Sequence, residues 1–407
     1  MKITTSLLLV LTALIIAACQ DDSFDLITLF ENNVQEHVFS DEGVHVTGNK
    51  LSIQSRMAHY KTPGLSLSVV DGYKPAWQRS YGFLRAGDPA MVDDNTIFQA
   101  GSVAKFVTAL IIMHYVEQGI FELDADVNTY LRRWQMPRNE YNQYVDITLR
   151  HLLSHQSGLP SSNMDRDESL PMPSLAQILD AEHPAINKPA APTFTPGEKW
   201  SYSNIGYVVI QMVLEDTFGK SLDELAHEVI FEPLGMDSST FNYPLKASMR
   251  HREAMPHTTE GEPREAVQDS LARAQGGLMT TTNDMARLLI ELMNTFNGEP
   301  TSVMSAATLK TMLLKQVDVP PGALGFPIGM GLGVFVDGEG ENVSFMHPGH
   351  NYPGSVFVVL AFPGLGQGLA LGINGNIGDR LEVEVASTLA DIYGWPSGDY
   401  FGLQSGN

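Results

Sequence analysis

The sequence has 407 residues, of which 43% are hydrophobic and 18% are charged, and this composition fits a globular chain that can bury a sizeable core. Its 47 acidic and 25 basic residues give a formal net charge of −22. Most of the surface should therefore repel phosphate backbones and anionic lipid headgroups, which disfavours nucleic-acid binding. We interpret the charge as a solvated acidic surface.

The first residues indicate an export signal. Lys2 precedes an apolar run, Leu7–Ala18, that is long enough for a signal-peptide core but shorter than the roughly 20 residues of a membrane-spanning helix. The run ends in Ile-Ala-Ala-Cys, which resembles the bacterial lipobox. We expect residues 1–18 to be removed and Cys19 to carry lipid, giving an exported, periplasm-facing lipoprotein anchored to a membrane. A plain secretory signal with an incidental cysteine is the alternative.

Two further observations concern this end of the chain. Cys19 is the only cysteine, so no intrachain disulfide can form. Gln20 follows it, which by analogy with enteric lipoproteins favours the outer membrane over the inner one. Residues 19–35 are expected to form a polar tether and the start of an N-terminal helix.

Strand patterns occupy two parts of the chain. Residues 64–72 and 76–83 alternate apolar and polar side chains and predict a strand pair. Turn-forming Gly, Asp and Pro residues separate four more strand-like runs near the end: 330–337, 343–349, 355–363 and 368–375. These runs predict an antiparallel meander.

Helical spacing of apolar residues dominates the region between the two strand sets. The segments with this spacing are 104–119, 147–158, 204–219 and 282–296, and an amphipathic stretch at 378–394 predicts a C-terminal helix that lies across the sheet. We expect one domain over residues 36–397, with an α/β part at about 36–95 and 275–397, a helical lobe at about 96–274, and a tail at 398–407.

The segment FQAGSVAKF places Ser102 and Lys105 at the start of a predicted helix, on the same face. A serine hydroxyl is a poor nucleophile at neutral pH. At a helix N-terminus the developing alkoxide meets a positive dipole, and a desolvated lysine amine can accept its proton. A Ser-x-x-Lys sequence is weak evidence alone, because chance produces about one in such a chain.

Two other short motifs occur once each. Tyr202 and Asn204 form the only Tyr-x-Asn, directly before an apolar helix, where a phenol can move a proton and an amide can orient a substrate carbonyl. His347 and Gly349 form the only His-x-Gly, at the end of a predicted strand. A glycine there allows close approach of a ligand to backbone N–H groups that stabilise an oxyanion. Individually, each motif also fits a helix cap or a turn.

The three motifs, in this order and spacing, resemble those of class C β-lactamases, D,D-peptidases and related esterases. The segments 147–160, 194–207, 230–241 and 274–289 also resemble the connecting segments of this family, so the similarity covers roughly residues 60–395. The resemblance implies a β-lactamase/transpeptidase-like α/β (α+β) fold. In that fold an antiparallel sheet is flanked by N- and C-terminal helices and carries an inserted, mostly helical lobe.

The resemblance also implies roles for individual residues. Ser102 is the acylated nucleophile, Lys105 its proton partner, Tyr202 the general base and later acid, and Asn204 a substrate-orienting amide. The backbone N–H groups of Ser102 and His350 form the oxyanion hole. Which of Lys105 and Tyr202 takes the first proton stays open.

The sequence departs from the β-lactamase pattern at its third motif. There the common form is Lys-Thr-Gly, whose lysine holds a substrate carboxylate, whereas His347 is only partly charged near neutral pH. We therefore expect a serine hydrolase of small esters, amides or peptides, with no cofactor and no metal. A true class C-like β-lactamase or D,D-carboxypeptidase is the alternative, and a catalytically silent binding protein on the same fold is another.

Competing motifs carry less weight. Ser161, Ser162 and Asn163 form a rival Ser-x-Asn element in a polar loop. No Gly-x-Ser-x-Gly segment supports an α/β-hydrolase. His151 and His155 have the helical i, i+4 spacing of zinc ligands, but no His-Glu-x-x-His is present and the flanking leucines favour a packed helix.

Overall fold

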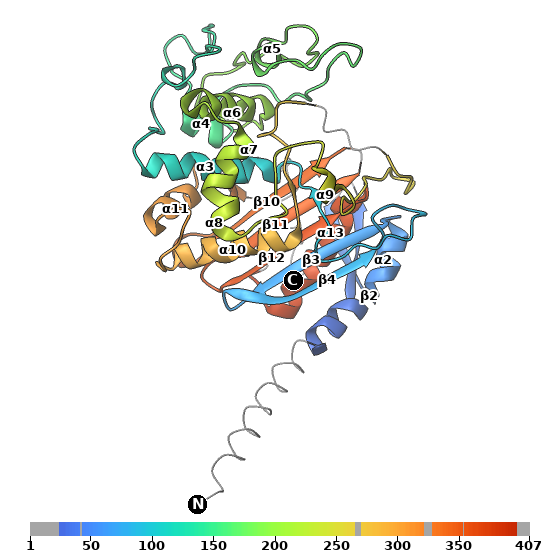
Figure 1. Ribbon diagram of the computed structural model, residues 1–407. Helices are drawn as coiled ribbons and strands as arrows, with labels where there is room; N and C mark the ends of the chain where they lie inside the picture. Colours follow the sequence, from blue (N-terminus) through green and yellow to red (C-terminus); the bar gives the residue numbers. More distant parts are fainter. Residues whose placement is uncertain (1–23, 41–42, 265–269, 321–327, 353, 397–407) are drawn as a thin grey trace, which may run out of the picture.

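The computed structural model describes residues 24–40, 43–264, 270–320, 328–352 and 354–396 (Figure 1). An eight-stranded sheet at its centre has the order β4-β3-β12-β11-β10-β9-β8-β7, and every neighbouring pair is antiparallel. The strands are β3 (Gly64–Asp71), β4 (Lys74–Gly82), β7 (Val317–Val319), β8 (Ile328–Met330), β9 (Phe335–Asp337), β10 (Ser344–Asn351), β11 (Ser355–Phe362) and β12 (Gln367–Ile373).

Helices cover both faces of this sheet, so its central strands are buried on both sides. Every residue of β11 is buried, which explains why its sequence is a continuous apolar run instead of an alternating one. On one face, α13 (Gly378–Tyr393), α2 (Ile53–His59) and the helical residues 24–32 share a core with β3, β11 and β12. On the other, α10 (Thr282–Phe296) packs against β3, β11 and β12, and α3 (Val103–Glu117) packs against β10 and β11.

The other helices of the middle of the chain are joined by long irregular segments, and α4 to α7 lie at the top of Figure 1. They are α4 (Leu149–Leu153), α5 (Leu175–Asp180), α6 (Asn204–Phe218), α7 (Leu222–Ala226), a π-helical turn (His227–Phe231), α8 (Glu232–Leu234) and α9 (Ala247–Arg250). A two-stranded ladder of β5 (Phe98–Gln99) and β6 (Met279–Thr280) lies next to the start of α3. Helix α11 (Ala306–Leu313) follows α10.

The predicted fold class is confirmed, with differences in detail. The strand pair at 64–72 and 76–83 is present as β3 and β4, and β10, β11 and β12 form the predicted meander. The prediction of a single strand at 330–337 is wrong. That run holds the end of β8 and all of β9, because Gly333 adopts a φ of 82° and turns the chain between them.

The sequence analysis also missed an N-terminal hairpin, β1 (Val34–Ser40) and β2 (Gly43–Leu51). The carboxylate of Glu384 on α13 joins this hairpin to Arg56 of α2. The Arg56 guanidinium donates to both carboxylate oxygens of Glu384 at 2.6 and 2.7 Å, and the backbone N–H of His37 on β1 donates to the same carboxylate at 3.0 Å. Since most hairpin residues are polar or exposed, no buried face marks these strands in the sequence.

The helix predicted at 147–158 is shorter than expected. It ends at Leu153 because His155 adopts a left-handed φ of 58°, which no helix can continue. The export signal, Cys19 and the tail at 398–407 lie outside the described residues, and the predicted domain boundaries remain predictions. No helix that the described residues form is long and apolar enough to cross a membrane.

Candidate active site

Ser102 lies at the N-terminus of α3, after Gly101 in a left-handed conformation with φ of 51°. A serine at this position usually caps the helix with its hydroxyl. The hydroxyl of Ser102 makes no capping hydrogen bond and instead accepts one from the Lys105 amine at 3.1 Å. The predicted nucleophile is therefore at a helix N-terminus with its oxygen turned to a base.

Lys105 is fully buried, one turn into the same helix. Its amine also donates to the carbonyl of Gln275 and lies 4.9 Å from the ring centre of Tyr202 and 5.7 Å from that of Tyr207. Burial holds the pKa of Lys105 well below its usual value. Burial thus favours the neutral amine more than at an exposed lysine, and the neutral form can accept the serine proton.

Tyr202 and Asn204 flank the start of α6, so the second motif meets the first as predicted. The Tyr202 phenol makes a hydrogen bond with Ser102, and burial raises its pKa well above the usual value. The phenol is therefore protonated at neutral pH and can donate as well as accept. Asn204 donates its amide to the carbonyl of Ser162 at 3.3 Å.

Strand β10 passes unusually close to the turn that holds Ser102. A Cβ added at Gly349 would overlap the carbonyl of Ala100 and lie 3.0 Å from the backbone nitrogen of Ser102. A Cβ added at Gly101 would lie 2.7 Å from the backbone nitrogen of His350. Glycine at both positions therefore brings His350 beside Ser102, where their N–H groups are predicted to bind an oxyanion.

These elements surround a cleft of about 410 Å³. Of the predicted site residues, its lining contains Ser102, Tyr202, Asn204 and His350. The sequence analysis did not assign several other lining residues: Met164, Asp165, Arg273, Gln275, Asn351 and Tyr352. Arg273 is the notable one, because it is cationic; its Nη2 donates to the carbonyl of Tyr243 at 3.1 Å. No motif includes it, and only the folded chain brings it to this place.

The structure places the His347 side chain behind the cleft, where it is fully buried, and not in the cleft lining. Its role in substrate binding stays a prediction. Successive side chains of a strand point to opposite faces, so His347 shares the face of Phe345 and Gly349 and packs against Phe335, with ring centres 5.4 Å apart. Burial and the nearby Lys105 amine lower the pKa of His347 to about 3, so the imidazole is neutral.

The competing motifs are not assembled into sites of their own. Ser162 supports the cleft wall, since its hydroxyl accepts the backbone N–H of Lys188 at 3.1 Å and its carbonyl holds Asn204. Because α4 ends before His155, the i, i+4 arrangement with His151 does not form. Among the residues described here, no three His, Cys, Asp or Glu side chains gather as a metal site would require.

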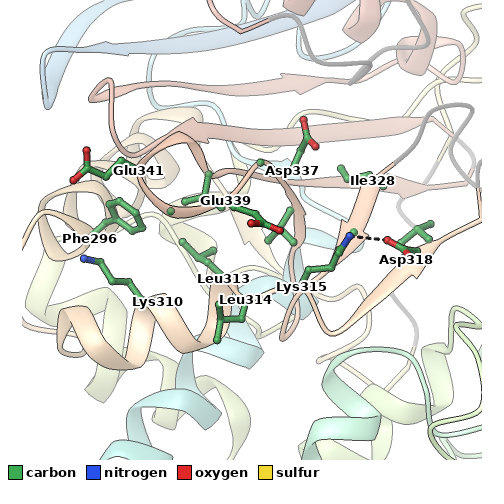
Figure 2. Close-up of a pocket in the computed structure, with 16 residues that line it drawn as sticks. Phe296, Lys310, Leu313, Leu314, Lys315, Asp318, Ile328, Asp337, Glu339 and Glu341 are labelled. Carbon is green, nitrogen blue, oxygen red and sulfur yellow. Dashed lines mark ion pairs between the residues drawn. The ribbon is translucent and has the colours of Figure 1, made fainter.

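A larger groove, about 1030 Å³, lies elsewhere, between α11, β8 and residues 338–343. Figure 2 shows Leu313, Leu314 and Ile328 along it and Lys315 in an ion pair with Asp318, at 2.9 Å. Its lining has no serine beside a lysine. Of these two hollows, only the smaller cleft is lined by Ser102.

The comparison with protein families agrees with this geometry. A family model described as Beta-lactamase matches residues 51–389, which include all three motifs. The chain belongs to the β-lactamase family. The matched residues include Ser102, Lys105, Tyr202 and His347.

Individual proteins are similar at moderate identity. Penicillin-binding protein 4 of Amycolatopsis lactamdurans is 31% identical over 266 residues, which are 63% of this chain and 66% of the relative. Unguisins hydrolase ungD' of Aspergillus campestris is 28% identical over 193 residues, which are 46% of this chain and 35% of that relative. The chain thus spans less than two thirds of either curated relative.

A solved structure supports the same fold. The octameric penicillin-binding protein homologue from Pyrococcus abyssi superposes with a TM-score of 0.69 at 25% identity, covering 84% of this chain and 76% of that one.

We predict that Lys105→Met lowers the rate at which an activated phosphonate labels Ser102 by about 10²- to 10⁴-fold, the usual effect of losing a positioned proton acceptor. The wild-type rate should rise with pH as Lys105 loses its proton, and the variant should lose this dependence. The free energy of unfolding should not fall, because methionine replaces a buried amine that has no carboxylate contributing to its pKa. The measurement is the labelling rate as a function of pH, with urea unfolding alongside.

Lys199→Met is the matched control, since its amine lies over the ring of Phe194 and outside the cleft lining. An unchanged pH profile in Lys105→Met would remove Lys105 from the proton path.

Proposed function

We propose that this protein is a serine hydrolase that forms an acyl-enzyme on Ser102. The observation that carries the proposal is the 3.1 Å contact between the Lys105 amine and the Ser102 hydroxyl, inside a buried environment that favours the neutral amine. A catalytically silent scaffold would have no need to bury an amine at this position.

Lys105 is proposed as the first base and Tyr202 as the group that relays the proton. As Ser102 Oγ attacks the substrate carbonyl, its proton passes to Lys105, and the tetrahedral oxyanion faces the N–H groups of Ser102 and His350. Tyr202 then gives its proton to the leaving group and regains one from Lys105. Water attacks the acyl-enzyme by the reverse path and restores Ser102. The raised pKa of Tyr202 supports this order, because a phenolate would be scarce at neutral pH.

Small esters, amides or peptides without an obligatory carboxylate are the proposed substrates. A lysine at the position of His347 would supply a permanent charge, whereas His347 is buried and neutral. The formal charge of −22 also disfavours the approach of anions. One observation favours a second candidate, a β-lactamase or D,D-carboxypeptidase: Arg273 lines the cleft and could hold a carboxylate.

We predict that mass spectrometry after incubation with an activated ester or phosphonate finds the adduct on the peptide that contains Ser102. The Ser102→Ala variant should remain unlabelled, because no other serine contacts the Lys105 amine among the described residues. Ser162→Ala is a matched control in the cleft wall and should be labelled normally. Labelling of a different serine, with Ser102→Ala still active, would overturn the mechanism.

We predict a higher kcat/KM for a neutral nitrophenyl ester than for a chromogenic cephalosporin, and little change in the ester value in Arg273→Gln. If the second candidate is correct, the cephalosporin is hydrolysed efficiently and Arg273→Gln lowers its kcat/KM by roughly ten- to a hundredfold, the worth of a charged hydrogen bond. The ester serves as the internal control. His347→Lys would not test the question, because that change buries a charge below the cleft.

We also propose that lipid on Cys19 anchors the exported protein to a membrane. The support is the sequence alone: Lys2, the short apolar run and the lipobox-like Ile-Ala-Ala-Cys. Metabolic labelling with a palmitate analogue should mark the wild-type protein in the membrane fraction, and Cys19→Ser should abolish both the label and the fractionation. An unlipidated wild-type protein in the periplasmic fraction would show that the lipobox interpretation is wrong.

A further inference from the structure

His155 lies behind the cleft and belongs to none of the three motifs. It is fully buried and follows the end of α4 with a φ of 58°. Its ring packs on Tyr202, with centres 4.3 Å apart and planes at 36°, and it also contacts Tyr207 and Trp200, whose ring centres lie 5.5 and 6.2 Å away. The imidazole is thus the surface against which the Tyr202 phenol ring lies.

The same residue holds the backbone on both sides of Tyr202. The N–H of Ser201 donates to the carbonyl of His155 at 2.8 Å, and the N–H of Ser203 donates to the imidazole Nδ1 at 3.1 Å. Two peptide groups that flank the tyrosine are therefore fixed to one histidine. Among the described residues the other ring nitrogen, Nε2, has no hydrogen-bond partner, so the only side-chain hydrogen bond of His155 is the one that holds this segment.

The hydrogen bond to Nδ1 determines where the ring carries its proton. Nδ1 can accept from Ser203 only when it is unprotonated, so the neutral ring has its hydrogen on Nε2. Burial, together with the nearby Lys105 and His347, lowers the pKa of His155 well below its usual value. The imidazole therefore stays neutral and keeps its acceptor available.

We propose that His155 is a positioning residue for Tyr202, which it holds at Ser102 by stacking on the phenol and accepting the N–H of Ser203. The proposal rests on the proposed acyl-enzyme function. Once its backbone is fixed on both sides, Tyr202 can move only about its two side-chain torsions, and the stacked imidazole restricts those. Because a displacement of about 1 Å in a reacting group can cost about 10²-fold in rate, this restraint should affect the chemistry directly.

The backbone conformation also explains why the residue is a histidine. Left-handed φ values are unusual for residues other than Gly, Asn, Asp and His. Asparagine would tolerate the backbone and offer an acceptor oxygen but no ring, whereas phenylalanine would offer a ring but no acceptor. The two substitutions therefore separate the hydrogen bond from the stacking contact.

The test uses His155→Asn and His155→Phe, each alone and combined with Tyr202→Phe. We expect each single change to lower kcat/KM for an amide substrate, whose leaving amine takes the Tyr202 proton, by about 10- to 100-fold. In the Tyr202→Phe background the same changes should alter the rate by less than about twofold, because the oxygen that His155 positions is already gone. His151→Phe, on the helix that ends just before His155 and outside the cleft lining, is the matched control and should leave the rate unchanged.

Equal losses in both backgrounds would show that His155 supports the fold in general, and would overturn the proposal. Urea unfolding of every variant shows whether a lower rate comes from a lower free energy of unfolding. If His155→Phe does not fold, His155→Asn alone still tests the proposal.

A second measurement does not depend on activity. ¹⁵N spectra of the full wild-type chain with labelled histidine should show one ring with Nδ1 unprotonated and Nε2 protonated, unchanged over roughly pH 5 to 9, and this signal should vanish in His155→Asn. Finding a charged ring or the opposite tautomer at His155 would overturn the proposal even if Ser102 is acylated. If the tautomer is as expected but wild-type Ser102 is never labelled, the proposed function fails and not the geometry of His155.

Discussion

The cleft depends on how closely strand β10 approaches the turn that precedes α3. Gly349 and Gly101 lie at the contact, and a Cβ at either position would overlap backbone atoms of the other segment. These backbone atoms cannot move aside as the end of a flexible side chain can. The approach sets the spacing between the nitrogen atoms of Ser102 and His350 and fixes the end of the helix that carries the nucleophile. Strand, turn and helix therefore form one rigid unit, which is what an oxyanion site needs to act without rearrangement.

The second constraint is the burial of an ionisable amine. Lys105 lies in the apolar helix α3 and contacts Ser102, and the rings of Tyr202 and Tyr207 lie around its amine where carboxylates would favour its charged form. Removing the amine from water disfavours its charged form, and a carboxylate nearby would have reversed that effect. The neutral state of His347 follows from the same environment, since burial is the main cause that lowers its pKa. The helical lobe and the sheet thus exclude water from a region in which Lys105, Tyr202 and His347 favour their neutral forms.

Long periodic segments were predictable from the sequence, and residues placed by tertiary contacts were not. Helix α10 covers the predicted residues 282–296, because one face of it is apolar throughout. Ser102 and Lys105 could be found because both lie in one turn of a helix. Arg273 carries no local signal, and its place in the cleft wall arises from the packing of a loop. The hairpin at β1 and β2 lacked a buried face, so its alternation could not be distinguished from that of an exposed segment.

The direction of the His347 side chain was not predictable for a different reason. Its position in a family motif suggested a role in the cleft, but the motif does not give the direction of a side chain. The period of two along the strand does not give it either, because Phe345 and Met346 are both apolar and buried, one on each face. His155 was likewise interpreted only as half of a weak zinc pattern, since nothing in the sequence shows that α4 ends before it.

The buried contact between Arg56 and Glu384 also bears on how the chain is made. The two residues are 328 positions apart, and Glu384 lies on the last helix. Until that helix has been synthesised, the guanidinium has no such partner and the sheet face that α13 covers stays exposed. Closure of this side of the molecule therefore waits for the synthesis of α13, and contacts of such long sequence separation form slowly. A ribosome that stopped before α13 would release a chain in which Arg56 has Glu36 but not Glu384 as an acidic partner and the apolar surface beneath α13 is open, the kind of product that proteases remove.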